Sequence, residues 1–153
     1  MLKKIIFIFL LCISFIGLSQ SDEIKWLSWE EAIRENAKNP KPIFVDLYTD
    51  WCGWCKKMDR ETFSDKAVIQ YMNAHFHCVK FDAEQKEPIK YKGNKYEFVT
   101  YGKDGYNSLA LALLNNQPQF PYFVVLNTQE QIIKRAPGYQ KKSRLLSILK
   151  NLH

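Results

Sequence analysis

The spacing of apolar and polar residues predicts a helix, a strand and a longer helical stretch in the first half of the chain. Ser28 and Glu31 have the spacing of a capping box, which predicts a helix to about Ala37, and "NPKP" ends it. Ile43–Tyr48 is short, apolar and bounded by turn residues, which is typical of a buried strand. The segment "WCGWCKKMDRETF" then begins a helical stretch that continues through "SDKAVIQYMNAH".

The second half predicts further strands and two helices. Phe76–Asp82 reads as a strand, and "IKYKGNKYEFV" as a hairpin around Gly93–Asn94. "NSLALALLNN" predicts a short helix, and "YFVVLN" with "EQIIKRA" an antiparallel pair of strands. The last segment predicts an amphipathic helix whose apolar face holds Leu145, Ile148, Leu149 and Leu152. This order predicts an α/β fold with a central mixed β-sheet flanked by helices.

The N-terminus has a different pattern, which predicts a secretory signal peptide. Lys3 and Lys4 precede the apolar stretch Ile5–Leu18, after which the chain turns polar. A membrane span needs about 20 apolar residues, so a cleaved signal is favoured over an anchor. We therefore expect a signal peptide at 1–19, no stable membrane span after its cleavage, and a domain at 20–153. Such a protein is exported, to the periplasm or as a secreted protein.

Composition and charge narrow the classes of function. Hydrophobic residues make up 46% and charged residues 25% of the chain, an ordinary globular balance. Without residues 1–19 there are 20 Lys+Arg against 16 Asp+Glu, and the basic residues are scattered. This scatter is typical of a solvated surface, and no nucleic-acid partner is expected. The remaining cysteines, Cys52, Cys55 and Cys78, are odd in number, which suggests one pair and one lone thiol in a strand.

The pair in "WCGWC" has three possible roles: a redox pair, half of a zinc site, or a structural staple. A redox cysteine needs a lowered pKa and access to solvent. Cys52 comes where a buried strand leads into a helix, and a helix N-terminus favours negative charge. Cys55 lies one turn deeper, placed to attack a mixed disulfide on Cys52. This context favours the redox role.

The zinc and staple roles fit less well. Zinc would need two more ligands, and "HFH" spaces His75 and His77 by one residue, closer than finger-type sites do. We interpret both histidines as surface residues near a strand start. A disulfide that closes so small a loop removes little unfolded-state entropy, so a staple would stabilise little. No metal or organic cofactor is expected.

The segment "FVDLYTDWCGWCK" resembles the active-site segment of the thioredoxin superfamily, in which a buried strand ends in W-C-x-x-C-K. Asp46 matches the family's acidic residue below the second cysteine, Pro121 in "QFPYFVVLN" its cis-proline, and Gly138 the glycine after its last strand. These matches are spread over residues 43–152 in the family's order. The resemblance implies a thioredoxin-like fold with an inserted hairpin plus helix, at about 83–118, before the cis-proline.

The resemblance also implies roles for particular residues. Cys52 attacks and Cys55 resolves, while a buried Asp46, with a raised pKa, carries protons for Cys55. A cis Phe120–Pro121 bond removes a backbone donor and holds a carbonyl towards the substrate chain. Trp51, Trp54 and Tyr122 are expected to form an apolar rim around Cys52 for an extended peptide. The expected substrate-binding residues are Trp51, Gly53, Trp54, Phe120 and Tyr122.

The sequence departs from thioredoxin in the dipeptide Gly53–Trp54, where thioredoxin has Gly-Pro. The redox direction therefore cannot be copied from thioredoxin. The "T-F-x-D" pattern after the active helix is similar to reductant-delivering domains of the Dsb system. We expect an exported thiol-disulfide oxidoreductase, a reductase or isomerase, whose partners are protein thiols and disulfides and a membrane electron donor of the Dsb type. The alternative is a non-enzymatic binding module that uses the 83–118 insertion as its contact surface.

Overall fold

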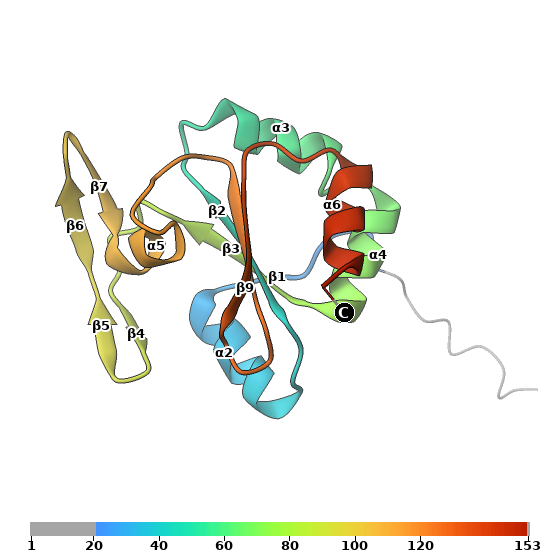
Figure 1. Ribbon diagram of the computed structural model, residues 1–153, viewed down its shortest axis with the longest axis horizontal. Coiled ribbons are helices and arrows are strands. Elements are labelled where there is room, and N and C mark those ends of the chain that lie inside the picture. The colour runs from blue at the N-terminus through green and yellow to red at the C-terminus, as the bar shows by residue number, and fades with distance from the viewer. Residues whose placement is uncertain (1–20, 153) are drawn as a thin grey trace, which may run out of the picture.

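A five-stranded sheet crosses the centre of the molecule in the order β1-β3-β2-β8-β9 (Figure 1). The computed structural model describes residues 21–152, so the signal peptide expected at 1–19 lies outside the described residues. β1, β3 and β2 are parallel, whereas β8 is antiparallel to β2 and β9 to β8. The predicted mixed sheet is thereby confirmed. Its strands are β1 (Trp26–Leu27), β2 (Ile43–Tyr48), β3 (His77–Asp82), β8 (Tyr122–Leu126) and β9 (Ile132–Pro137).

Helices cover both faces of this sheet and bury two separate hydrophobic cores. The first core lies under α2 (Trp29–Lys38) and α5 (Ser108–Leu113). The second lies under α3 (Gly53–Glu61), α4 (Lys66–His75) and α6 (Lys142–Lys150). Leu145 and Leu149 of α6 are buried in the second core, with Ile148 and Leu152 packed against it, as the amphipathic pattern predicts.

Strand β2 supplies side chains to both cores, because successive residues of a strand point to opposite faces. Val45 and Leu47 lie in the first core, and Phe44 lies in the second. The alternation therefore places Asp46 on the face that α3 covers.

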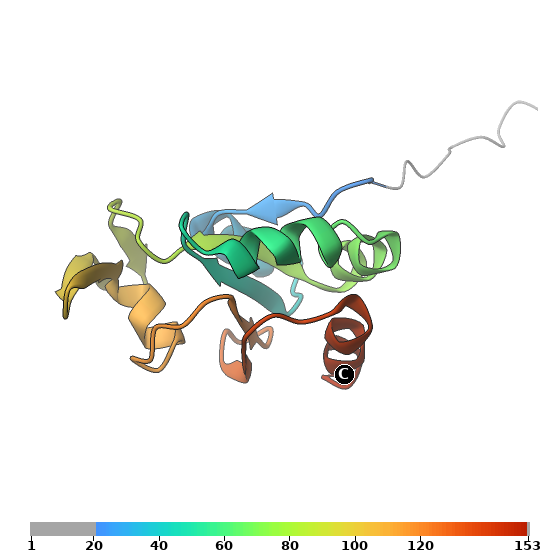
Figure 2. The same ribbon diagram turned by 90° about the horizontal axis from the view of Figure 1, so that it is seen from above.

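The insertion consists of two hairpins followed by α5. The first hairpin pairs β4 (Ile89–Tyr91) with β5 (Asn94–Tyr96), and the second pairs β6 (Phe98–Tyr101) with β7 (Asp104–Asn107). Only the first was predicted, and its turn lies at Lys92–Gly93, one residue earlier than expected, where both residues have positive φ. Figures 1 and 2 show the hairpins at one end of the molecule, with α6 at the other. The side chains of α5 belong to the first core, and Ile89 of β4 and Tyr106 of β7 also reach into it, so the insertion is anchored to the rest of the fold by these residues.

The helix starts follow from local hydrogen bonds. Ser28 Oγ accepts from the backbone N–H of Glu31, and Glu31 Oε2 accepts from the backbone N–H of Ser28, which confirms the capping box of α2. Asn107 caps α5 through a 3.0 Å hydrogen bond from the backbone N–H of Leu109. The predicted helical stretch after the cysteines divides into α3 and α4, because Asp65 caps a new helix start.

Candidate active site

Cys52 and Cys55 lie where β2 leads into α3, and they form a disulfide with a Cα–Cα distance of 5.3 Å. The chain turns after β2 through a 3.1 Å hydrogen bond from the backbone N–H of Cys52 to the carbonyl of Thr49. Cys52 is the N-cap of α3, and its Sγ accepts from the backbone N–H of Cys55 at 3.1 Å. A backbone N–H at a helix start that donates to a sulfur favours its negatively charged form, so this position suits a reactive thiolate.

The disulfide is less accessible than the sequence suggests. Cys52 is 4% and Cys55 is 3% exposed, whereas the neighbouring Trp51 and Trp54 are 64% and 57% exposed. The solvent access expected for Cys52 is therefore not present in the disulfide form. A reacting partner therefore has to approach between exposed indole rings.

Two pairs of aromatic rings flank the disulfide. The Trp51 ring packs edge-to-face on Phe120 at 6.0 Å, and its Nε1 donates a 3.0 Å hydrogen bond to Glu84 Oε1. On the other side, the Trp54 and Tyr139 ring centroids lie 5.6 Å apart. Tyr139 was not among the residues predicted from the sequence, although it directly follows Gly138. Gly53 lies between the two tryptophans, and the space that a side chain would enter there is open.

Tyr122 does not belong to this rim, contrary to the sequence-based expectation. It is 7% exposed and packs in the first core. Tyr122 is directly opposite Leu47 in the antiparallel β2–β8 pair, and opposite residues point to the same face of a sheet. Because Leu47 points into the first core, Tyr122 does so as well.

The loop before β8 approaches the redox pair through Phe120. The Phe120–Pro121 peptide bond is cis, as expected, and the carbonyl of Pro121 accepts a 2.8 Å hydrogen bond from the backbone N–H of Gly138. Gly138 follows β9 and has a φ of 83°, a conformation that favours glycine. Within residues 21–152, the backbone N–H and C=O groups of Gln119 and Phe120 have no hydrogen-bond partner.

Asp46 is buried beside α3 and forms an ion pair with Lys80 of β3, whose Nζ lies 2.7 Å from Asp46 Oδ2. The same ammonium also contacts the carboxylate of Asp59 on α3. The pairing follows from register, because Asp46 and Lys80 are partners in the parallel β2–β3 ladder. Three aromatic rings, those of Trp26, Tyr48 and Phe63, have centroids 5.1–5.3 Å from the Lys80 Nζ atom.

Burial and the neighbouring charges shift the pKa values of Asp46 and Lys80 in opposite directions. Burial raises the pKa of the Asp46 carboxyl above its ordinary value, and the positive charge of Lys80 only partly offsets this. Burial alone would lower the pKa of the Lys80 ammonium, but attraction to Asp46 and Asp59 outweighs it and raises that pKa. Sequence reasoning singled out Asp46 and missed Lys80 and Asp59. The signal for Lys80 was a charged residue inside the otherwise apolar part of "FHCVKFD".

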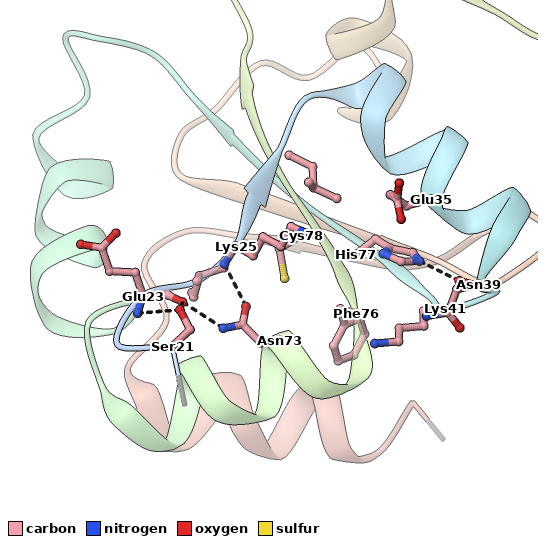
Figure 3. Close-up of a pocket in the computed structure, with 12 residues that line it drawn as sticks. Ser21, Glu23, Lys25, Glu35, Asn39, Lys41, Asn73, Phe76, His77 and Cys78 are labelled. Carbon is pink, nitrogen blue, oxygen red and sulfur yellow. Dashed lines mark hydrogen bonds between the residues drawn. The ribbon is translucent and has the colours of Figure 1, made fainter. Parts of the chain in front are cut away.

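A separate pocket of about 530 Å³ lies at the other end of β3, near the first described residues (Figure 3). His77 lines it and is buried, with Nε2 2.8 Å from the Asn39 carbonyl oxygen, so the expectation of a surface residue is wrong for His77. That expectation failed because β3 is covered by neighbouring elements from its first residue. Cys78, also in the lining, is a buried free thiol, as predicted, and burial raises its pKa to about 12. A thiol with so high a pKa is a poor nucleophile.

Residues 21–152 hold no cluster of three or more His, Cys, Asp or Glu side chains arranged for a metal ion. None of the helices in this range has the length and apolar character that crossing a membrane requires.

Comparisons with known proteins identify the relatives of the chain. A family model named Thioredox_DsbH, described as "Protein of unknown function, DUF255", matches residues 13–143. "Disulfide bond reductase DsbH" of Chlamydia pneumoniae is 31% identical over 64 residues, 41% of this chain and 39% of the relative. "Thiol:disulfide interchange protein DsbD" of Campylobacter jejuni is 35% identical over 75 residues, 49% of this chain and 13% of the relative. The chain spans only 8–10% of the first curated relatives that it matches.

Solved structures confirm the thioredoxin-like fold. A "DsbH Oxidoreductase" superposes with a TM-score of 0.62 at 19% identity, covering 91% of this chain and 90% of the other. A "putative disulphide-isomerase from Bacteroides thetaiotaomicron" gives a TM-score of 0.59 at 28% identity, covering 86% and 94%.

Proposed function

Since the chain belongs to the Thioredox_DsbH family (DUF255) of thioredoxin-fold, disulfide-oxidoreductase-like proteins, we propose that it exchanges thiols and disulfides with protein substrates through Cys52 and Cys55. One observation carries this proposal: the two cysteines form a pair at the N-terminus of α3, between exposed tryptophans. The names of its relatives, a disulfide bond reductase and thiol:disulfide interchange proteins, support the same chemistry.

The proposed reaction begins with the reduced protein. The Cys52 thiolate attacks one sulfur of a substrate disulfide, so that a Cys52–substrate S–S bond forms and the substrate S–S bond breaks. The released substrate sulfur takes up a proton. The Cys55 thiol then loses its proton to the ionised Asp46 carboxylate and attacks the Cys52 sulfur, which frees the second substrate sulfur as a thiol. The substrate disulfide is reduced by two electrons, and the dithiol is oxidised to the Cys52–Cys55 disulfide.

Asp46 suits the role of proton carrier because it is buried on the face that α3 covers and its pKa is raised. A general base works best when its pKa approaches the working pH. Lys80 supports this role by holding the ionised carboxylate through their 2.7 Å contact.

The test of the proposed function is reduction of insulin disulfides with dithiothreitol as the electron source. Cys52→Ser is expected to abolish turnover, and Cys55→Ser to accumulate a mixed disulfide on Cys52 that is visible by mass spectrometry. Cys78→Ser, at the buried thiol outside the site, is the matched control and is expected to keep turnover. A Cys52 thiol with an ordinary pKa of about 8.5, together with no turnover, would refute an enzymatic role.

The direction that we favour is reduction or isomerisation, in accord with the name of the Chlamydia relative, a disulfide bond reductase. Equilibration with glutathione measures the reduction potential of the Cys52–Cys55 pair. A value near about −270 mV, like that of thioredoxin, is expected for a reductase, whereas a value near about −120 mV would indicate an oxidase.

Export and regeneration complete the proposal. The pattern of residues 1–19 supports a cleaved signal peptide and a periplasmic or secreted protein. A reductase working there needs its dithiol restored by a second dithiol donor, for which a membrane protein of the Dsb type is the candidate. Mass spectrometry of the protein from fractionated cells tests this, and an intact N-terminus in the cytosolic fraction would contradict it.

The alternative is a thioredoxin-fold binding module without catalytic activity. The exposed Val99 and Tyr101 of the insertion favour it, because large apolar side chains exposed in a group often contact a partner. This module would bind its partner equally well with Cys52 and Cys55 both replaced by Ser, whereas the enzyme requires both cysteines.

A further inference from the structure

The strongly exposed large apolar side chains of the described residues are few. Trp51 and Trp54 flank the disulfide, and Val99 and Tyr101 belong to the insertion, each 39% exposed. Ile133 on β9 is the fifth, at 42%. Val99 and Tyr101 lie far from Trp51 in sequence, so their position relative to the redox site depends on how the insertion folds back.

The register of the second hairpin places Val99 and Tyr101 on one face. Val99 is directly opposite Tyr106, and opposite residues in an antiparallel pair point to the same side. Tyr101 is two residues from Val99 and shares that side. Phe98 points to the other side, where its ring fills the space beside Gly105 and the Lys86 ammonium covers it. The Phe98 ring is therefore covered on its side, whereas Val99 and Tyr101 remain exposed on theirs, beside the buried Tyr106. We call the side that holds Val99 and Tyr101 the open face.

A continuous row of rings joins the open face to the redox site. Tyr101 contacts Tyr106 at 6.2 Å between centroids, Tyr106 contacts Phe120 at 6.0 Å, and Phe120 contacts Trp51 at 6.0 Å. We call these four residues the aromatic row. The Tyr101 hydroxyl donates a 2.7 Å hydrogen bond to the Asn116 carbonyl, which fixes the hairpin against the loop that leads to Phe120.

The surface along this row suits an extended polypeptide. The unpaired backbone groups of Gln119 and Phe120 lie between Trp51 and the hairpin, and a second chain in an extended conformation can pair with them. The three ring-to-ring distances along the row from Trp51 to Tyr101 are about 6 Å each. An extended chain advances about 3.3 Å per residue, so about five residues of a bound chain span the distance from Trp51 to Tyr101. A partner whose sulfur meets Cys52 thus places its neighbouring residues within reach of Val99 and Tyr101.

We propose that Val99 and Tyr101 extend the peptide-binding surface of the redox site and select substrate proteins with an aromatic or large aliphatic side chain within about five residues of the reactive cysteine. The occupant is an extended segment of the substrate protein itself. The inference rests on the proposed function, and it names the class of substrate that the same site prefers.

The test uses the full-length reduced protein and synthetic peptide disulfides. Each peptide has one cysteine in a mixed disulfide with glutathione, and a single Phe or Ser placed three to five residues before or after it. The wild-type protein is expected to reduce the best Phe peptide with a kcat/KM about tenfold above that of its Ser counterpart. Glutathione disulfide, which is too small to reach the hairpin, is the reference substrate.

The double variant Val99→Ser/Tyr101→Ser is expected to bring the Phe-to-Ser ratio to about one and to leave the reduction of glutathione disulfide unchanged. Ile133→Ser removes an equally exposed apolar residue outside the aromatic row, and it is expected to keep the tenfold ratio. Should the double variant fail to fold, Val99→Ser alone answers the question, with an expected drop in the ratio of about threefold.

The outcomes separate this inference from the proposed function. A wild-type protein that reduces neither the peptides nor glutathione disulfide refutes the proposed function. Reduction of all peptides at equal rates leaves that function standing and overturns the inference. A wild-type dimer that Val99→Ser/Tyr101→Ser dissociates would assign the open face to a second copy of this chain, which also overturns it.

Discussion

At the scale of single residues, the burial of the Asp46 carboxyl has a cost in stability and underlies the proposed role of this residue as a proton carrier. Its carboxyl is buried, and the pKa is raised because burial outweighs the attraction of Lys80. A raised pKa means that the folded protein holds the proton more tightly than the unfolded chain. The stability that this proton contributes is fully present below the unfolded pKa, near 3.8, and is lost as pH rises through the folded pKa.

The variant Asp46→Asn tests both aspects. The difference in free energy of unfolding, variant minus wild type, is expected to increase as pH rises from 4 to 8, because only wild type has a carboxyl proton to lose. Insulin reduction is expected to fall, because the carrier of the Cys55 proton is gone. Denaturant unfolding of the oxidised protein at several pH values measures the first effect. A variant that loses stability steadily as pH rises would contradict the pKa direction.

Asp59 affects the site through its charge, which acts on Asp46 directly and is shared with Lys80. Its negative charge raises the pKa of Asp46, and it shares the Lys80 ammonium. In Asp59→Asn the pKa of Asp46 is expected to fall, so the acidic limb of the pH–rate profile moves to lower pH. Glu35→Gln, at a comparably exposed carboxylate on α2, is the control and is expected to leave the profile in place. An acidic limb that moves upward in Asp59→Asn would refute this coupling.

The positions of candidate site residues were predictable where a local sequence pattern marks them. Asp46 lies in the apolar strand segment before Cys52, and Pro121 directly precedes a later strand segment, so all three stand out in the sequence. Lys80 and Asp59 depend on strand register and helix packing, which no local pattern specifies. Tyr122 was misplaced because a strand start next to the active loop gives no sign of which face its first residue takes.

At the scale of elements, the insertion depends on one buried side chain. Asn107 caps α5, and its Nδ2 donates to the carbonyl oxygens of Glu87 and Tyr96 at 3.4 and 3.5 Å. It therefore connects the helix, the first hairpin and the segment before it. A buried side chain with this many partners leaves several polar groups unsatisfied when it is removed.

Asn107→Ala is expected to cost about 2–3 kcal/mol, because it removes a helix cap and two further bonds in a buried place. Ser28→Ala, which removes an exposed cap from α2, is the matched comparison and is expected to cost about 1 kcal/mol. Urea unfolding of both variants gives the two values. If Asn107→Ala costs no more than Ser28→Ala, the two carbonyl contacts contribute nothing.

Helices and strands were easier to predict from the sequence when they were longer and when apolar residues set them off clearly from polar neighbours. β2 was predicted with its observed bounds because six residues between turn signals are unambiguous. β1 has two residues and exists only through its pairing with β3, so no periodicity could reveal it. The second hairpin was missed although Gly102, with a φ of 66°, marks its turn, because its strands mix polar and aromatic residues.

At the scale of the whole molecule, the redox state and the folding equilibrium are linked. Folding shifts the reduction potential of the Cys52–Cys55 pair from its value in the unfolded chain. The size of this shift reflects the difference in free energy of unfolding between the oxidised and the reduced protein. A low potential, as proposed for a reductase, requires the oxidised protein to be the more stable one.

We expect the oxidised protein to unfold at higher denaturant concentration than the reduced protein, with a difference of about 1–3 kcal/mol, where 30 mV corresponds to about 1.4 kcal/mol. Parallel unfolding curves with and without excess dithiothreitol measure it, and Cys52→Ser/Cys55→Ser controls for effects of the reductant. A reduced protein more stable than the oxidised one would indicate an oxidase.

The two cores on opposite faces of the sheet have a consequence for how such a protein can diversify. The disulfide-bearing helix and the Lys80 group belong to the face of the second core, whereas α5 and the buried Tyr106 under the open hairpin face belong to the first. If the proposed function and substrate preference hold, substitutions that change the redox chemistry and substitutions that change the choice of substrate protein fall in different parts of the molecule. Natural selection can alter either property while the other is inherited unchanged.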